Sequence, residues 1–178
     1  METSPRALSL EILNRIESTD AYADILIEEA FRRHPLKDVD KGLLTELVYG
    51  TLRWRERIDF IISLFSSIKP PKMERDILNI LRLGAYQILF LDRIPEWAAV
   101  ELSVELVLRI LRTKVYGHAG VAGFVNAILR NIIRNKEGIS YSSIEDDPVL
   151  HISVFYSHPE WLVRRWVKCF GIDETISL

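Results

Sequence analysis

The residues of this chain that could do chemistry are cations, and they gather in two short stretches. The members are Arg53, Arg55 and Arg57 in the first stretch and Arg130, Arg134 and Lys136 in the second. Guanidinium and ammonium groups bind phosphate through charge-assisted hydrogen bonds, so both stretches are compatible with an anionic partner. The alternative is an ordinary solvated surface, because arginines spaced i, i+2, i+4 point different ways on a helix and can pair with acids such as Glu56 or Asp59.

Nucleophilic and metal-binding residues are scarce by comparison. The chain has one cysteine, Cys169, and four histidines at 34, 118, 151 and 158, which show no spacing typical of metal ligands. A single cysteine permits no internal disulfide, which fits a reducing compartment. Cys169 lies in a tryptophan-rich stretch and is predicted to be a packing residue. We therefore predict no catalytic, cofactor-binding or metal-ligating residue in this chain.

Composition points to a folded protein that meets an anionic partner locally. Of 178 residues, 48% are hydrophobic and 27% are charged, which excludes disordered and low-complexity chains. The net charge of −2 hides a central segment, 41–136, that carries 15 basic and 9 acidic residues. The first six residues have no apolar signal core, and no apolar run approaches the ~20 residues of a membrane span. We expect a soluble, cytoplasmic protein without a membrane partner.

Helical periodicity runs through the first three quarters of the chain and must position these cations. Ser4 and Pro5 favour a helix start, Pro35 ends a second helix, and Asp40 is predicted as the N-cap of the next, which breaks between 50 and 55. Prolines at 70 and 71 then separate a helix over 72–92, apolar on so many sides that it should be the most buried. Another helix over 98–111 and a glycine-containing loop at 116–120 follow.

The segment 123–134 is predicted to be a core helix on which the other helices pack. Its apolar residues recur at i, i+3, i+4, i+7 and i+8, which predicts a helix with one broad buried stripe. The opposite face carries Arg130 and Arg134. These could simply complement the dipole at the helix end or could contact an anion. With no alternating strand pattern, residues 1–136 are predicted to form an all-α, irregular bundle of about seven helices.

The amino-acid composition of the sequence changes after residue 136. Residues 137–156 contain Lys-Glu-Gly, a serine-rich run and Glu-Asp-Asp-Pro, which indicate a linker. Residues 157–178 then predict a short helix that starts near His158 and ends at Gly171, rich in tryptophan. Such an apolar helix needs a surface to pack on, so we interpret 157–178 as the start of a further, truncated domain.

Four segments in order carry a family resemblance. They are 40–53 (DKGLLTELVYGTLR), 83–89 (LGAYQIL), 94–95 (IP) and 124–130 (FVNAILR). Together they resemble the NusB-like RNA-binding domain at the N-terminus of Sun-type bacterial ribosomal RNA cytosine-C5 methyltransferases. The segment 157–163 (SHPEWLV) is similar to the one that opens the methyltransferase region of that family. The free-standing antitermination factor NusB is not expected to carry such a tail.

The resemblance implies an RNA-binding accessory domain of a ribosomal RNA methyltransferase, involved in rRNA processing, with ribosomal RNA and a catalytic domain in cis as partners. S-adenosylmethionine is implied for the full-length parent only, because the family's cofactor pocket and its two catalytic cysteines lie beyond the region that matches. NusB-like domains resemble one another in using first-helix arginines for RNA, which adds Arg6. The predicted RNA-binding set is therefore Arg6, Arg53, Arg55, Arg57, Arg130, Arg134 and Lys136. Two alternatives remain open: a NusB-like antitermination factor that regulates transcription, and a purely structural packing module.

Overall fold

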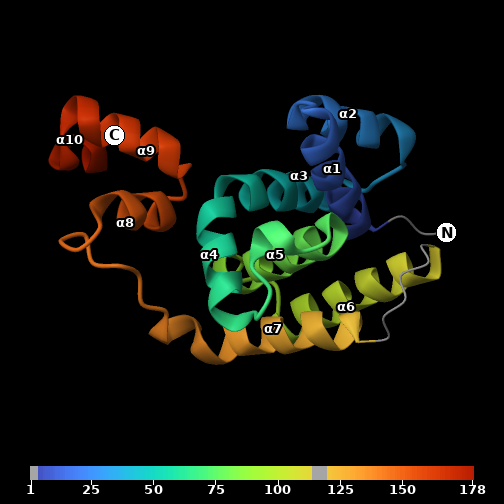
Figure 1. Ribbon diagram of the computed structural model, residues 1–178. Helices are drawn as coiled ribbons and strands as arrows, with labels where there is room; N and C mark the ends of the chain where they lie inside the picture. The colour runs from blue at the N-terminus through green and yellow to red at the C-terminus, as the bar shows by residue number, and fades with distance from the viewer. Residues whose placement is uncertain (1–3, 114–119) are drawn as a thin grey trace.

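A computed structural model describes residues 4–113 and 120–178, and these ranges contain helices and no strand (Figure 1). The first part comprises α1 (Pro5–Thr19), α2 (Ala23–Arg33), α3 (Asp38–Arg53), α4 (Arg55–Phe65), a 3-10 turn η1 (Pro70–Lys72), α5 (Arg75–Phe90), α6 (Glu96–Thr113) and α7 (Val121–Asn135). The rest comprises η2 (Lys136–Gly138), α8 (Pro148–Phe155), α9 (Glu160–Phe170) and α10 (Ile172–Ser177). The all-α prediction is confirmed. Residues 116–119 of the expected loop, His118 included, lie outside the described residues.

Helix α5 is the centre of the bundle. It contacts α1, α3, α4, α6 and α7, and its residues from 76 to 88 are all buried. The prediction that the helix over 72–92 is the most buried is therefore confirmed. Gly84 allows this close packing, because a Cβ at that position would lie 2.7 Å from both Leu129 Cδ1 of α7 and Ser103 Oγ of α6.

Two of the predicted features of the helix ends are present in the structure, and one is not. Ser4 caps α1 by accepting a 3.2 Å hydrogen bond from the Ala7 amide, with Pro5 at the first helical position. Helices α3 and α4 break at Trp54, within the predicted interval. The predicted N-cap at Asp40 is wrong, because α3 already begins at Asp38, so Asp40 is in the first turn, where a carboxylate complements the helix dipole.

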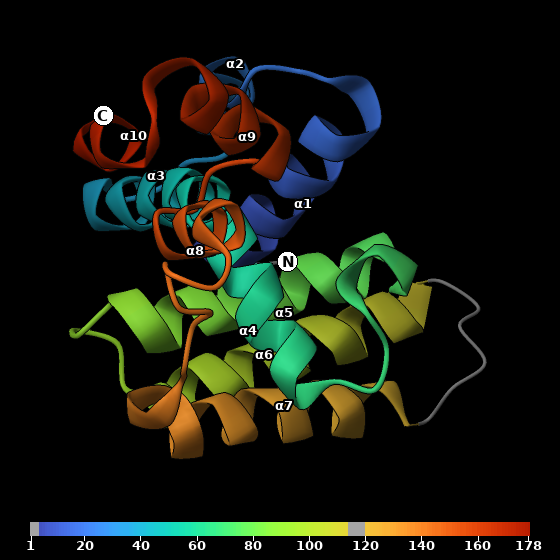
Figure 2. The ribbon, with the colours of Figure 1, turned by 60° about the vertical axis from the view of Figure 1, so that its left-hand side comes forward.

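The second half of the predicted linker is also helical. Helix α8 occupies 148–155, within the expected linker 137–156, and Asp147 caps it by accepting a 2.9 Å hydrogen bond from the Leu150 amide. Helix α9 begins at Glu160 and ends before Gly171, as predicted. We call α8–α10 the C-terminal lobe. This lobe lies beside the bundle, with α8 against α4 (Figures 1 and 2).

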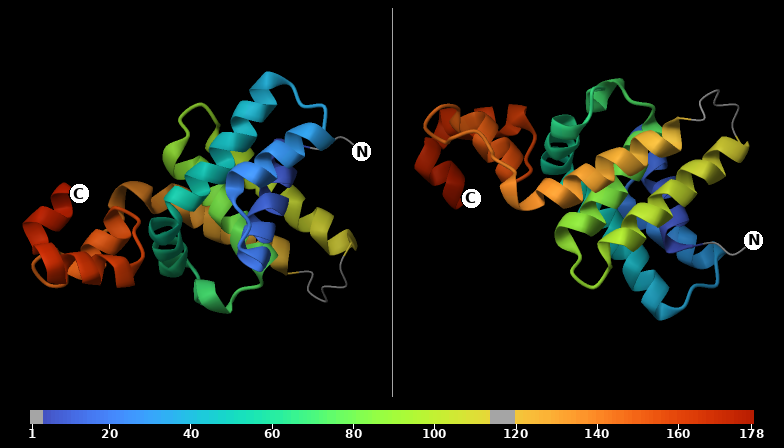
Figure 3. Two further views of the ribbon diagram at one scale, coloured as in Figure 1. Left: turned by 90° about the horizontal axis from the view of Figure 1, so that it is seen from above. Right: turned by 90° about the horizontal axis from the view of Figure 1, so that it is seen from below.

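Different helices form the two outer sides of the bundle. Helices α2 and α3 lie on one side and α6 and α7 on the other, and the two views of Figure 3 look onto these opposite sides. Helix α7, with its cations, therefore lies on one outer side of the bundle, and the α3–α4 junction lies next to the C-terminal lobe.

Among the described residues, none of the helices combines the length and the apolar character that crossing a membrane requires.

Candidate nucleic-acid interface

Helix α7 presents a cationic surface without acidic residues on the same helix. Its buried stripe consists of Val125, Ile128, Leu129 and Ile132, which pack into the core. Arg130 and Arg134 lie one turn apart on the opposite side and are exposed. The sequence from 121 to 136 contains no carboxylate, so no acid on this helix competes for the two guanidinium groups. The structure thus brings this predicted pair together on one face.

Amide side chains accompany the two arginines. The Arg130 Nε donates a 3.0 Å hydrogen bond to Oδ1 of Asn126, one turn earlier on α7. Asn131 is half-buried between the arginines. Guanidinium and carboxamide groups both bind phosphate and sugar oxygens, so this face has the donors that a nucleic-acid backbone requires.

Lys136 ends the same helix but has a partner. Its Nζ lies 2.6 Å from Glu96 Oε1 at the start of α6, and the hydrogen bond to Glu96 raises the pKa of Lys136. Both side chains are more than a third exposed, so solvent screens the pair and its contribution to stability is small. Lys136 is nevertheless partly neutralised, and it joins the ends of α6 and α7.

The three arginines of the first cluster take separate directions around the α3–α4 junction. Arg53 is exposed at the end of α3. Arg55 is half-exposed and lies 3.4 Å from a carboxylate oxygen of Glu56. Arg57 turns inward, and its Nε donates a 2.8 Å hydrogen bond to the hydroxyl of Tyr141. Spacing at i, i+2, i+4 separates them, as the alternative interpretation of the sequence anticipated.

Arg57 is held in an aromatic cluster. Its guanidinium carbon lies 5.6 Å from the ring centroid of Trp54, 5.8 Å from Phe90, 4.9 Å from Tyr141 and 5.1 Å from Phe155. Cations above aromatic faces are attracted by the ring quadrupole. Arg57 also lines a cavity of 260 Å³ together with Lys136. The structure therefore gives Arg57 an intramolecular role that sequence inspection did not reveal.

Arg6 has an intramolecular partner on the central helix. It lies in the first turn of α1, and its Nε donates a 2.7 Å hydrogen bond to Oε1 of Gln87 on α5. Burial lowers the pKa of Arg6 from its ordinary value, although an arginine stays charged at neutral pH. Arg6 thus helps to dock α1 on α5.

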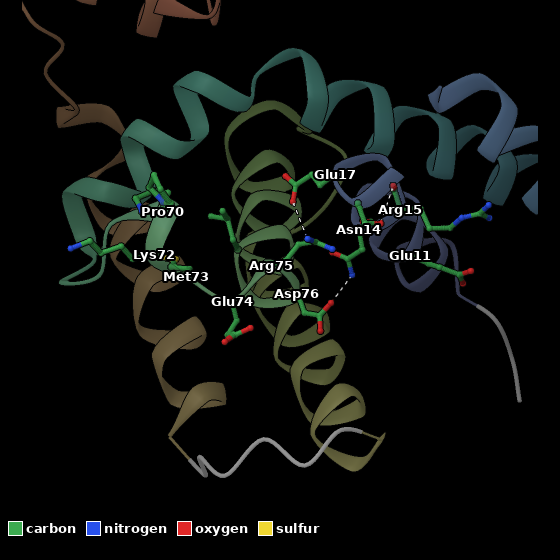
Figure 4. A pocket seen from close by; sticks show the side chains of 13 residues that line it. Glu11, Asn14, Arg15, Glu17, Pro70, Lys72, Met73, Glu74, Arg75 and Asp76 are labelled. Carbon is green, nitrogen blue, oxygen red and sulfur yellow. Dashed lines mark hydrogen bonds and ion pairs between the residues drawn. The ribbon is translucent and has the colours of Figure 1, made fainter. Parts of the chain in front are cut away.

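A cavity next to α1 has a different character. It has a volume of 790 Å³ and lies between α1, η1 and the start of α5 (Figure 4). Four carboxylates, from Glu11, Glu17, Glu74 and Asp76, line it beside the cations of Arg15, Lys72 and Arg75. Mixed charge of this kind does not select an anion. None of the described residues that line this cavity is aromatic.

Metal ligands and the single cysteine are the remaining candidates for chemistry. Among the described residues, no group of three or more His, Cys, Asp or Glu side chains could hold a metal ion. Cys169 is exposed on α9, so the prediction that it is a packing residue is wrong for this chain. It lies on the outer side of an amphipathic helix of which Val163 is the buried residue.

Comparison with known proteins places this geometry in a family context. The model of the NusB family matches residues 3–134. The "Probable ribosomal RNA small subunit methyltransferase B" of Bacillus subtilis is 40% identical over 97% of this chain, and that of Synechocystis is 34% identical over 98%. The chain spans 36% and 37% of the length of these two relatives.

Solved structures agree on the fold. The structure titled "T. maritima NusB, P3121, Form 2" superposes with a TM-score of 0.63 at 24% identity, covering 75% of this chain and 93% of its own. The structure titled "Crystal Structure of PH0851" covers 98% of this chain and 38% of its own, with a TM-score of 0.66 at 18% identity. The first likeness covers three quarters of the chain, and the second extends over nearly all of it.

Proposed function

The chain belongs to the NusB family, and we propose that it is the RNA-binding domain of a ribosomal RNA small-subunit methyltransferase. In this proposal the outer face of α7 binds the RNA backbone, and the chemistry belongs to another part of such a protein. The methyl donor S-adenosylmethionine, cytosine-C5 specificity and a catalytic domain in cis belong to the same proposal.

The outer face of α7 is the observation that carries the proposal. Arg130 and Arg134 are exposed on a helix without carboxylates, whereas Arg6, Arg57 and Lys136 are held by partners on other elements. The names of the relatives give the class of RNA, and the fraction of their length that the chain spans, about a third, supports the assignment of methyl transfer to the remainder. Arg53 and Arg55 lie at the α3–α4 junction and would add weaker contacts.

Phosphate contacts supply most of the affinity in such an interface, and they are sensitive to salt. Each engaged cation adds about 0.7 to the slope of log K against log salt concentration on single-stranded RNA. Loss of both α7 arginines should therefore lower that slope by roughly 1.4. Arg6, Arg57 and Lys136 are held by intramolecular partners, so their replacement should change the slope less.

The test is fluorescence anisotropy with a labelled fragment of small-subunit ribosomal RNA, titrated at two salt concentrations. The variant Arg130→Glu/Arg134→Glu should bind more weakly to every sequence tried and should show the smaller slope. Its unfolding free energy should stay within about 0.5 kcal/mol of wild type, because both side chains are exposed and lie off the buried stripe.

The matched control is Arg32→Glu/Lys37→Glu. Both residues are exposed near the end of α2, on the other side of the bundle, and the change in net charge is identical. This control should bind nearly as well as wild type. The proposal fails if the wild-type chain binds no RNA at low salt, or if the two charge reversals weaken binding equally. In that case the bundle is a packing module for its catalytic neighbour.

A further inference from the structure

The side chain of Ser157 caps the N-terminus of α4, which lies about a hundred residues earlier in the chain. Helix α4 starts directly after the α3–α4 break, and its N-cap residue Trp54 makes no side-chain hydrogen bond to the first turn. The Ser157 hydroxyl accepts hydrogen bonds from the amides of Glu56 at 3.1 Å and Arg57 at 3.4 Å. The first amides of a helix have no intrahelical acceptor, so Ser157 supplies what Trp54 cannot.

The turn that contains Ser157 is held by contacts with α8, which precedes it, and with α9, which follows it. Ser157 has a φ of 59°, in the left-handed region that residues with a Cβ seldom adopt. Ser153 of α8 fixes this turn, because its hydroxyl donates to the His158 carbonyl at 2.7 Å and its carbonyl accepts from the His158 amide at 2.9 Å. The His158 ring then packs edge-to-face on Trp166 of α9, with 5.2 Å between centroids. Contacts therefore run without a break from α4 to α9.

Arg57 makes the second connection, beside the first. Two rings of its aromatic cluster, Trp54 and Phe90, belong to the bundle. The other two, Tyr141 and Phe155, belong to the segment that follows η2 and to α8. Because Arg57 Nε also donates to the Tyr141 hydroxyl, one guanidinium is shared between the bundle and the chain that leads to the C-terminal lobe. Its loss would leave the two pairs of rings without the cation between them.

We infer that Arg57 and Ser157 are positioning residues that fix the orientation of the C-terminal lobe on the bundle, and with it the direction of the α7 face relative to α9. The basis is that both residues act at the first turn of α4, where α4 and α8 are in contact. This inference goes beyond the proposed function and holds whether or not α7 binds RNA. Arg57 is then a residue of the junction between the two parts, although its sequence neighbourhood resembles a phosphate-binding cluster.

The test measures the distance between the two parts in the full chain. Spin labels are placed on Cys169, the one cysteine of the sequence, which is exposed on α9, and on a cysteine introduced by Ala127→Cys on the exposed face of α7. Double electron–electron resonance should give one narrow distance distribution in the parent. The variant Arg57→Ala/Ser157→Ala should broaden it, and the matched control Arg53→Ala/Ser63→Ala, two exposed residues of α3 and α4, should not.

Amide hydrogen exchange gives a local readout that general destabilisation would not reproduce. In Ser157→Ala, the amides of Glu56 and Arg57 should exchange about fivefold faster, as expected for the loss of a capping acceptor, whereas those of Ile61 and Ile62 should keep their protection. A narrow distance distribution in the double variant, or unchanged exchange at both amides, overturns the inference. If the double variant does not fold, the milder Ser157→Ala/Tyr141→Phe pair removes only two hydroxyl groups and is measured in the same two ways.

Discussion

Replacement of Arg82 tests whether the centre of the bundle depends on a buried ionic network. Arg82 lies on α5 with 8% of its side chain exposed, and its Nε and Nη2 donate to the two carboxylate oxygens of Asp59 on α4, both at 2.7 Å. Its Nη1 bonds Asn79 at 2.9 Å and also pairs with Glu17 of α1. Burial alone lowers the pKa of Arg82, but the hydrogen bonds and charges of Asp59 and Glu17 outweigh it and raise that pKa overall.

The change Arg82→Met keeps an unbranched side chain that fills the space of the arginine's methylene groups, and it removes the cation. Asp59 and Glu17, which are 22% and 25% exposed in their side chains, then lose their shared counter-ion. Breaking a buried ion pair from one side costs about 3–5 kcal/mol, and access of solvent to both carboxylates favours the lower end, about 3 kcal/mol. For a domain of this size that corresponds to a fall in melting temperature of roughly 6–12 °C. Urea unfolding followed by circular dichroism measures the free energy, and calorimetry measures the melting temperature.

Two comparisons separate this cause from simple loss of packing. Arg75→Met removes an exposed arginine 3.9 Å from the same Glu17 and should cost less than about 0.5 kcal/mol, as exposed pairs do. Adding Asp59→Asn to Arg82→Met should restore part of the lost stability, because only one unpaired carboxylate remains. A loss below about 1 kcal/mol for Arg82→Met, or costs that simply add in the double variant, would refute the reasoning.

Three further predictions concern the core and the cofactor. Leu81→Ala should destabilise the chain by about 2–5 kcal/mol in urea unfolding, since Leu81 is fully buried on α5, and a loss below about 1 kcal/mol would show that the core is elsewhere. Gly50→Ala should cost about 1–3 kcal/mol or more, because the new Cβ would lie 2.0 Å from the Tyr86 ring and force it to move, which near-ultraviolet circular dichroism would register. Calorimetry should detect no saturable binding of S-adenosylmethionine to this chain, and measurable binding would contradict the assignment of methyl transfer to another part of the protein.

Much of the fold could be predicted because local chemistry and tertiary packing agree. The apolar stripes of α1 to α7 and the prolines between them specify both the helices and the faces that they bury. Helix α8 shows where this logic fails. Its residues are apolar on nearly every side, so they give no stripe, and the Asp147–Pro148 start that caps it could equally belong to a linker. The prediction of Asp40 as an N-cap failed for a related reason, because acidic residues are common both at the N-cap and in the first turn of a helix.

In the candidate site too, local patterns predict some residues and miss others. The exposure of Arg130 and Arg134 follows from the buried stripe of their own helix, so a pattern within α7 is enough to predict it. Arg57 could not be placed in that way. Its neighbours Arg53 and Arg55 indicate a basic cluster, whereas its actual partners include Tyr141, 84 residues later. Contacts of that separation exist only after the chain has folded, and no local period encodes them.

The position of Ser157 shows that a boundary in the sequence need not be a boundary in the structure. The segment from 157 onward resembles the start of a separate region, and the residues before it resemble a linker. Yet Ser157 caps α4 of the bundle, and the two amides that it accepts from belong to residues about a hundred positions earlier. A division of the chain just before Ser157 would leave the amides of the first turn of α4 without this acceptor. These contacts connect the part of the chain that matches the family, which ends at residue 134, to α8 and to the turn at Ser157.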